Sequence, residues 1–131
     1  MTDPLGGWVL DVAALVAFAD RARYAEAVLA TAAQRGLTLL VPSPALSQAY
    51  DARPHHIGGP RLATLLEHPL ALVSSPSDVP LELLRKLAEI AGGDQVAAHV
   101  AYLADRRGWS VLTDRGELLR RIRPGLVIIP A

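Results

Sequence analysis

Five short runs of apolar residues are the feature that most restricts how this chain can fold. Each run is apolar at consecutive positions instead of alternating apolar with polar, which is typical of strands buried on both faces of a parallel sheet. Longer stretches with Leu, Val and Ala at helical spacing lie between them. The predicted strands cover residues 8–10, 37–41, 70–73, 110–113 and 126–129.

The alternation of strands with helices predicts an α/β protein with a three-layer α/β/α fold and a mainly parallel central sheet. A length of 131 residues suits one domain that spans residues 1–131. Residues 53–60 contain two Pro and two Gly and are predicted to form a loop. Ser77 or Asp78 is predicted to cap the helix that follows. The predicted helices cover residues 12–20, 24–35, 43–51, 61–67, 81–90, 94–107 and 117–122.

The composition narrows the classes of function. The charges balance, with 13 basic and 13 acidic residues, so any site for a polyanion must be local. The chain has no Cys, which excludes disulfides, thiol catalysis and thiolate zinc sites. Residues 1–7 do not resemble a signal peptide, and no stretch reaches the roughly 18 apolar residues of a membrane helix. A cytoplasmic protein with no membrane partner is expected.

Three aspartates follow or precede predicted elements in a way that suits a metal site. Asp11 and Asp114 come directly after apolar strands, and Asp94 opens a helix. Ligands of open parallel sheets bind beyond the carboxyl ends of the strands, where these side chains would meet. Carboxylates brought together need a cation, and Mg²⁺ or Mn²⁺ suits oxygen ligands and can activate a water. Taken singly, however, Asp94 is a good helix N-cap, and the other two are common turn residues.

Four segments together resemble a known family, the PIN domains. These are WVLDVAALVA at residues 8–17, DQVAAHVAYLA at residues 94–104, WSVLTDR at residues 109–115 and LVII at residues 126–129. Their order and spacing resemble the family's opening strand, late helix, Thr-and-Asp strand and closing strand. The resemblance covers essentially the whole chain, and it is strongest to the bacterial toxins of toxin–antitoxin pairs.

The resemblance assigns candidate catalytic and metal-binding residues. Asp11 matches the first family aspartate, and Asp94 matches the acidic residue that opens the late helix. Thr113 and Asp114 match the last strand's Thr and Asp, although the family usually has one residue between them. Asp114 is therefore expected to point in a slightly different direction from the family's aspartate. Glu117, one helical turn further on, is a candidate to replace Asp114 in the site.

A second departure from the family lies in the helix after the second predicted strand. The family has a Glu there, and this chain has Gln48. Gln48 retains a carbonyl oxygen but has no negative charge, so it would hold a divalent cation less tightly. It is a candidate metal ligand and the residue that puts catalysis in question.

Other polar residues have weaker assignments. Arg115 and Thr113 are the predicted RNA contacts, with Arg115 suited to a bidentate bond to a phosphate. The alternative for Arg115 is a solvated residue near a helix end. His99 and His68 are predicted to be structural. His55 and His56, in the predicted loop, are expected to be exposed to solvent. The alternative is that they bind a metal or contact phosphate.

Two functions remain from different classes. The resemblance implies a metal-dependent endoribonuclease that uses Mg²⁺ or Mn²⁺, with RNA as substrate and an antitoxin protein as partner. The alternative is a degenerate PIN-like domain that binds RNA, a nucleotide or a protein partner without cleavage. The resemblance also implies a homodimer, for which the apolar helices at residues 61–67 and 81–90 are the candidate interface.

Overall fold

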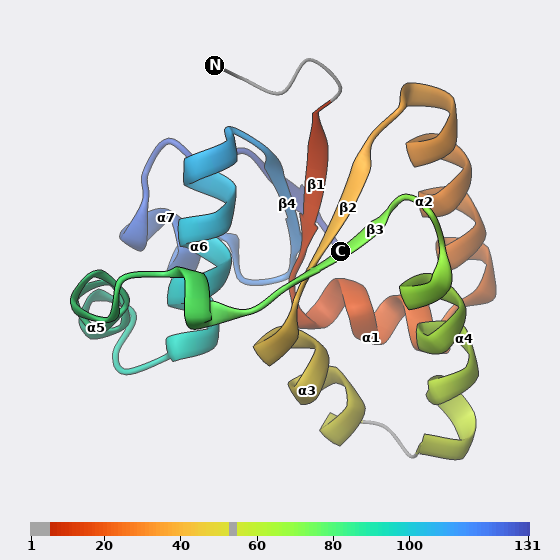
Figure 1. Cartoon of the computed structure of the whole chain (residues 1–131), viewed down its shortest axis with the longest axis horizontal. Helices are drawn as coiled ribbons and strands as arrows, with labels where there is room; N and C mark the ends of the chain where they lie inside the picture. Colours follow the sequence, from red (N-terminus) through yellow and green to blue (C-terminus); the bar gives the residue numbers. More distant parts are fainter. Residues whose placement is uncertain (1–5, 53–54) are drawn as a thin grey trace.

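A parallel sheet flanked by helices forms the centre of the molecule (Figure 1). The structure, a computed structural model, describes residues 6–52 and 55–131. The strands are β1 (Gly7–Leu10), β2 (Thr38–Pro42), β3 (Ala71–Ser74), β4 (Ser110–Thr113) and β5 (Ile128–Pro130). The α-helices are α1 (Val12–Asp20), α2 (Ala22–Arg35), α3 (Ser43–Ala52), α4 (His55–Glu67), α5 (Leu81–Ile90), α6 (Gln95–Arg107) and α7 (Gly116–Ile122).

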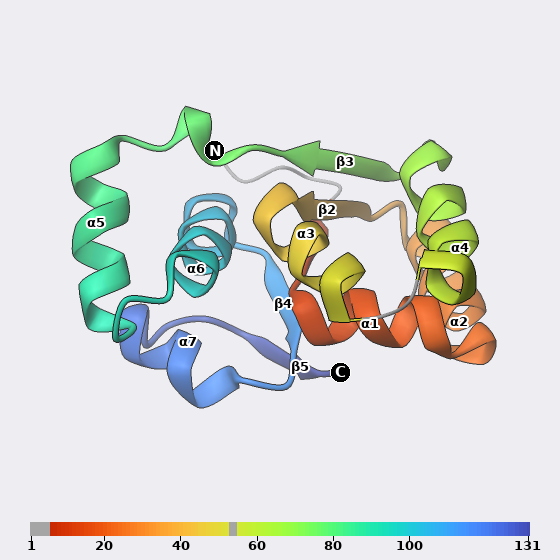
Figure 2. The ribbon, with the colours of Figure 1, turned by 90° about the horizontal axis from the view of Figure 1, so that it is seen from below.

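The sheet has the strand order β3-β2-β1-β4-β5, and each neighbouring pair is parallel. Helices α5, α6 and α7 lie on one side of it and α2 and α4 on the other, as Figures 1 and 2 show. This arrangement confirms the predicted α/β fold class with three layers. It also confirms that the strands containing Val9 and Val111 are neighbours, with the C-terminal strand beside them.

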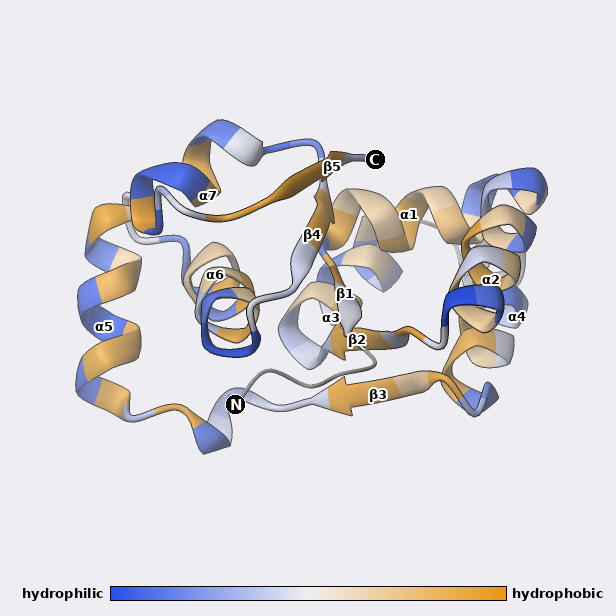
Figure 3. Cartoon of the chain, turned by 90° about the horizontal axis from the view of Figure 1, so that it is seen from above, coloured by the Kyte–Doolittle hydropathy of each residue, from blue (hydrophilic) through white to orange (hydrophobic). Residues whose placement is uncertain are grey.

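Burial explains why the central strands are apolar at every position. Val9, Leu39, Leu40 and Val111 are fully buried, because helices cover both faces of the sheet. Figure 3 shows the hydrophobic strands at the centre and polar residues on the outer helices. The edge strand β3 differs, since Leu72 and Val73 are both exposed.

The predicted loop at residues 53–60 is largely wrong. Helix α4 begins at His55 and includes Pro60, while residues 53 and 54 lie outside the described part of the chain. Leu62 and Leu65 in the same helix are fully buried, and α4 packs against α1. Tertiary packing of this apolar face outweighs the local preference of Gly and Pro for turns.

The predicted cap of α5 is also wrong. A short 3-10 helix (Pro76–Asp78) comes first, and the Oγ of Ser75 accepts a hydrogen bond from the Ser77 amide. Helix α5 begins three residues after Asp78, directly after Pro80. Among the described helices, none combines the length and hydropathy needed to cross a lipid bilayer.

Candidate functional site

The site lies at the carboxyl ends of β1 and β4. The parallel register pairs Leu10 with Leu112, so Asp11, directly after β1, lies beside Thr113, the last residue of β4. The backbone amide of Asp11 donates to the Leu112 carbonyl at 3.0 Å, which extends the pairing by one residue. The predicted position of Asp11 at this edge of the sheet is therefore confirmed, and it results directly from parallel pairing.

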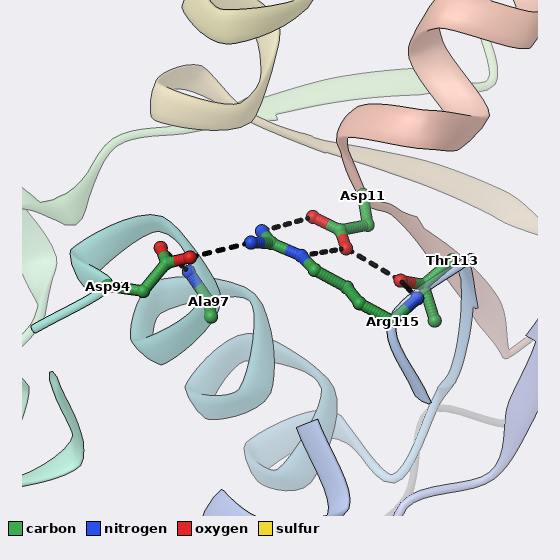
Figure 4. A network of polar contacts seen from close by, with 5 residues as sticks. All are labelled: Asp11, Asp94, Ala97, Thr113 and Arg115. Carbon is green, nitrogen blue, oxygen red and sulfur yellow. Dashed lines mark hydrogen bonds and ion pairs between the residues drawn. The ribbon is translucent and has the colours of Figure 1, made fainter. Parts of the chain in front are cut away.

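The Asp11 carboxylate is completely buried, with 0% of its surface exposed. Its Oδ2 accepts hydrogen bonds from Thr113 Oγ1 at 2.7 Å and from Arg115 Nε at 2.7 Å. Its Oδ1 accepts from Arg115 Nη2 at 2.9 Å. Figure 4 shows this bidentate contact. A buried carboxylate needs such partners, because an unpaired charge in the core is very unfavourable.

Asp94 has two roles in the structure. Its Oδ1 accepts a hydrogen bond from the Ala97 amide at 2.9 Å, so it is the N-cap of α6. This confirms the simpler of the two interpretations of Asp94. Its Oδ2 accepts from Arg115 Nη1 at 2.7 Å, so the same carboxylate also faces Asp11 across the guanidinium (Figure 4).

Arg115 is the centre of this network. Three of its nitrogen atoms donate to the carboxylates of Asp11 and Asp94, and its side chain is 23% exposed. Burial alone would lower the pKa of the Arg115 guanidinium, but the hydrogen bonds and charges of the two aspartates outweigh burial and raise it. Arg115 therefore stays charged, and three of its donor atoms bind the carboxylates of Asp11 and Asp94. Its contact with an RNA phosphate stays a prediction.

Thr113 positions both charged partners. Its hydroxyl donates to Asp11 and accepts a hydrogen bond from the Arg115 backbone amide at 3.0 Å. Only 1% of Thr113 is exposed. In this structure the Thr113 hydroxyl is thus buried and bonded within the protein, and the RNA contact expected of Thr113 stays a prediction.

The third aspartate does not join the other two. Asp114 is exposed and lines the adjacent cleft, as does Gln48. Glu117, the candidate substitute, is exposed on α7. In the part of the chain that the structure describes, no three His, Asp or Glu side chains are placed to hold one metal ion. The predicted convergence of Asp11, Asp94 and Asp114 is thus not found, and the arranged residues do not fit a divalent cation held by three carboxylates.

The spacing after Thr113 explains this outcome. Side chains of consecutive residues in an extended chain point to opposite sides, so Arg115, two positions after Thr113, reaches Asp11, whereas Asp114 is exposed in the lining of the cleft. The separation of Thr113 and Arg115 in the sequence was the signal for this arrangement. Arg115 stands two positions after Thr113, which is the separation at which an extended chain returns a side chain to the same side.

A cleft of about 550 Å³ opens beside this network. Its apolar wall comes from α1, and its polar lining includes Gln48, Asp114 and Arg115. Asp20 and Arg21 at the end of α1 add one charge of each sign. The apolar lining from α1 is Val12, Ala13, Val16 and Ala17.

The histidines outside this site fit their predicted structural roles. His99 in α6 is buried, which lowers the pKa of its imidazole. Nδ1 of His68 accepts a hydrogen bond from the Leu70 amide at 3.2 Å. The side chains of His55 and His56 lie outside the described part of the structure, so their expected exposure remains a prediction.

Comparison with known proteins supports the fold. The structure is similar to the crystal structure of PAE2754 from Pyrobaculum aerophilum, with a TM-score of 0.67 and 22% sequence identity. The similarity covers 95% of this chain and 84% of that one. At this identity it shows the fold alone. No protein-family profile matches the chain, and no curated protein does.

Proposed function

We propose that this chain is a PIN-like domain that binds a protein segment in the cleft beside Arg115 and does not cleave RNA. The observation that carries the proposal is the guanidinium of Arg115 between Asp11 and Asp94. A positive side chain stands where the family would have a third acidic group. Gln48, in place of the family's Glu, removes a further negative charge from the same region.

The charge of the site favours a protein partner over RNA. The Arg115 guanidinium binds the carboxylates of Asp11 and Asp94, so this network carries one net negative charge, and Asp114 in the lining of the adjacent cleft adds a second. The opposite charges of Asp20 and Arg21 contribute no net charge to the cleft. Excess negative charge repels a phosphate backbone, whereas it attracts Lys or Arg in a peptide.

The shape of the cleft supports the same partner. Its volume of about 550 Å³ and its wall of small apolar α1 side chains suit an apolar side chain of a bound segment. A peptide with a basic residue beside an apolar one would match the cleft. An antitoxin protein, as the resemblance implies, is one candidate for such a partner.

The test combines cleavage with complex formation. Labelled single-stranded RNA is incubated with the parent protein and with Asp11→Asn, in Mg²⁺ and in Mn²⁺, and no cleavage by either is expected. Co-expression with the product of the neighbouring reading frame should give a co-purifying complex. Ala17→Arg, which adds bulk and positive charge to the cleft wall, should weaken that complex.

Metal-dependent endoribonuclease activity is the second candidate. It is favoured by the close approach of Asp11 and Asp94 and by the location of Asp114 and Gln48 in one cleft. It requires Arg115 to leave the two carboxylates. RNA cleavage by the parent protein that Asp11→Asn abolishes, and that Gln48→Glu increases, would favour this candidate over the binding module.

A further inference from the structure

We propose that the groove between α2 and β5 is a docking site for an acidic amphipathic helix of a partner protein. This groove has a volume of about 180 Å³ and shares no lining residue with the cleft beside Arg115. The proposal therefore does not rest on what binds in that cleft.

The groove runs between one side of α2 and one face of the sheet. Tyr24, Ala27 and Thr31 line the first wall, at the helical spacing that places them on one side of α2. Leu112 and Ile129, which are paired neighbours on β4 and β5, line the second wall. Most of the surface inside the groove is apolar, so a bound segment must present apolar side chains to it.

Strand β5 leaves one of its two faces largely uncovered. Ile128 points toward α7, because a Cβ on Gly116 would lie 3.0 Å from its Cγ2. Successive side chains of a strand point to opposite faces, so Ile129 and Val127 face away from α7. Val127 is 60% exposed and extends the apolar wall of the groove toward the start of β5. A helix docked beside α2 would cover this face, as α7 covers the other.

The outer edge of β5 favours a helix over an added strand. The amide of Ala131, directly after β5, donates to the Thr113 carbonyl at 3.1 Å. Backbone groups alternate in direction along a strand, so those of Ile128 and Pro130 face away from β4. Pro130 has no N–H, so an added strand would find one amide donor, that of Ile128, in β5. A helix needs no such donor, because its backbone hydrogen bonds are internal.

Positive charge at the two ends of the groove selects an acidic partner. The Arg21 guanidinium lies 5.6 Å from the centroid of the Tyr24 ring, and that of Arg35 lies 5.8 Å from the Trp8 ring. Both rings line the groove, and about 20 Å of helix separates the two arginines. Among the described residues that line the groove there is no Asp or Glu, and Glu26 of α2 lines a different pocket. Carboxylates at both ends of a docked helix would complement this charge.

The aromatic residues of the groove favour a polypeptide over a nucleic acid. A single strand of nucleic acid binds where its bases stack on open aromatic rings. Trp8 and Tyr24 each have a guanidinium over the ring, and the wall from β4 and β5 is aliphatic. The anionic chain that suits this groove is therefore one with apolar side chains as well as carboxylates.

Fluorescence anisotropy with a defined peptide tests the proposal. The probe is a labelled Ala-rich helix of about 18 residues, with Leu residues spaced three and four apart and Glu in the first and last turns. A second probe has Lys in place of each Glu. The parent protein should bind the Glu probe saturably and about tenfold more tightly than the Lys probe, and added NaCl should reduce the difference.

Variants of α2 assign the binding to the groove. Ala27→Glu, at an exposed groove residue, should weaken binding of the Glu probe by about tenfold, through bulk and like charge. Ala33→Glu, on an exposed side of α2 outside the groove, is the matched control and should bind as the parent does. Arg35→Glu should weaken binding of the Glu probe and strengthen that of the Lys probe. Arg35 is preferred to Arg21 for this exchange, because Arg21 also lines the other cleft.

Three results would overturn the proposal. They are no saturable binding of the Glu probe by the parent, equal binding of the two probes, and equal loss of binding in Ala27→Glu and Ala33→Glu. If circular dichroism shows that Ala27→Glu does not fold, Val127→Glu on the opposite wall takes its place with the same expected loss. Ala17→Arg, which alters the other cleft, should bind the Glu probe as the parent does, so either proposal can fail without the other.

Discussion

Thr113 shows how much one hydroxyl can organise. It lies at the end of β4, donates to Asp11 and accepts from the Arg115 amide, so it fixes both members of a buried ion pair. Its partners are 102 residues away in one case and two in the other. The geometry of the pair therefore depends on this residue although Thr113 carries no charge.

Replacing Thr113 tests this role. Thr113→Val keeps the shape and removes both hydrogen bonds, so it should lower the free energy of unfolding by about 1–3 kcal/mol. Thr113→Ser keeps the hydroxyl, so its free energy of unfolding should fall by clearly less than that of Thr113→Val. Urea denaturation followed by circular dichroism measures both values. Equal stability of the Val and Ser variants would show that the hydroxyl does not matter.

His99 is a buried polar residue that, unlike Thr113, lacks hydrogen-bond partners for its side chain in the described part of the chain. Neither of its ring nitrogens has a hydrogen-bond partner among the described residues. Burial lowers the pKa of the imidazole, so the folded protein keeps His99 neutral. Because the unfolded chain has the ordinary pKa of about 6.5, protonation favours the unfolded state.

The free energy of unfolding is therefore expected to decrease as the pH falls. The contribution of His99 to stability is complete above about pH 6.5 and is lost as the pH falls toward its lowered pKa, at no more than about 1.4 kcal/mol per pH unit. His99→Leu should make stability fall less steeply between about pH 7 and pH 5. At neutral pH it should equal or exceed the parent by about 1 kcal/mol.

Urea denaturation across this pH range measures the effect. His68→Asn is the control, since it removes a histidine outside the core and keeps an acceptor near the Leu70 amide. A slope that is the same in the parent and in His99→Leu contradicts the assignment to His99.

At the scale of elements, the start of β1 is closely packed. A Cβ on Gly7 would lie 2.6 Å from two ring carbons of Trp109 and 2.7 Å from the Thr38 carbonyl oxygen. The Trp109 ring therefore packs directly on the backbone of β1. Gly59 in α4 is the opposite case, because a Cβ there would meet nothing within 4 Å.

These two glycines form a matched pair of variants. Gly7→Ala should destabilise the protein by about 1–3 kcal/mol, because either Trp109 or the strand must move. Gly59→Ala should stabilise it by about 0.5–1 kcal/mol, since Ala is the better residue in a helix. Thermal unfolding of both variants against the parent measures the difference. A stabilising Gly7→Ala would mean that Trp109 does not pack on β1.

At the scale of the whole molecule, some apolar side chains are left uncovered. Helix α5 buries Leu87 against the core but leaves Leu81 70% and Ile90 50% exposed. Helix α4 buries Leu62 and Leu65 in the core, so α5 is the better candidate for an interface between two copies. Leu81 and Ile90 lie at opposite ends and on opposite sides of α5, so they are two separate exposed apolar positions of this helix.

The expected homodimer can be tested on this surface. Multi-angle light scattering at micromolar concentration should give the mass of a dimer for the parent. The double variant Leu81→Glu/Ile90→Glu should give a monomer, because it places charges at the proposed contact. Val127→Glu, at an exposed apolar residue whose backbone pairs with β4, should remain dimeric. A monomeric parent contradicts the expectation.

The sequence alone determined the order of the elements and the class of the fold. Continuous apolar runs such as residues 8–10 reflect burial on both faces, which is a local property that periodicity records. Gly36 and Gly108 end α2 and α6 with left-handed backbone, at φ 65° and 69°, a conformation that glycine adopts readily at the C-terminus of a helix. Asp11 at a strand end and Asp94 at a helix start were likewise visible in the sequence.

The tertiary structure decided how these residues are used. Arg115 meets Asp11 over 104 residues of chain and Asp94 over 21, and only packing of β1, β4 and α6 brings the three together. Helix α4 forms through residues predicted as a loop, because burial of its Leu side chains outweighs Gly and Pro. Local patterns predict elements, whereas charge pairing and side-chain direction depend on neighbours distant in sequence.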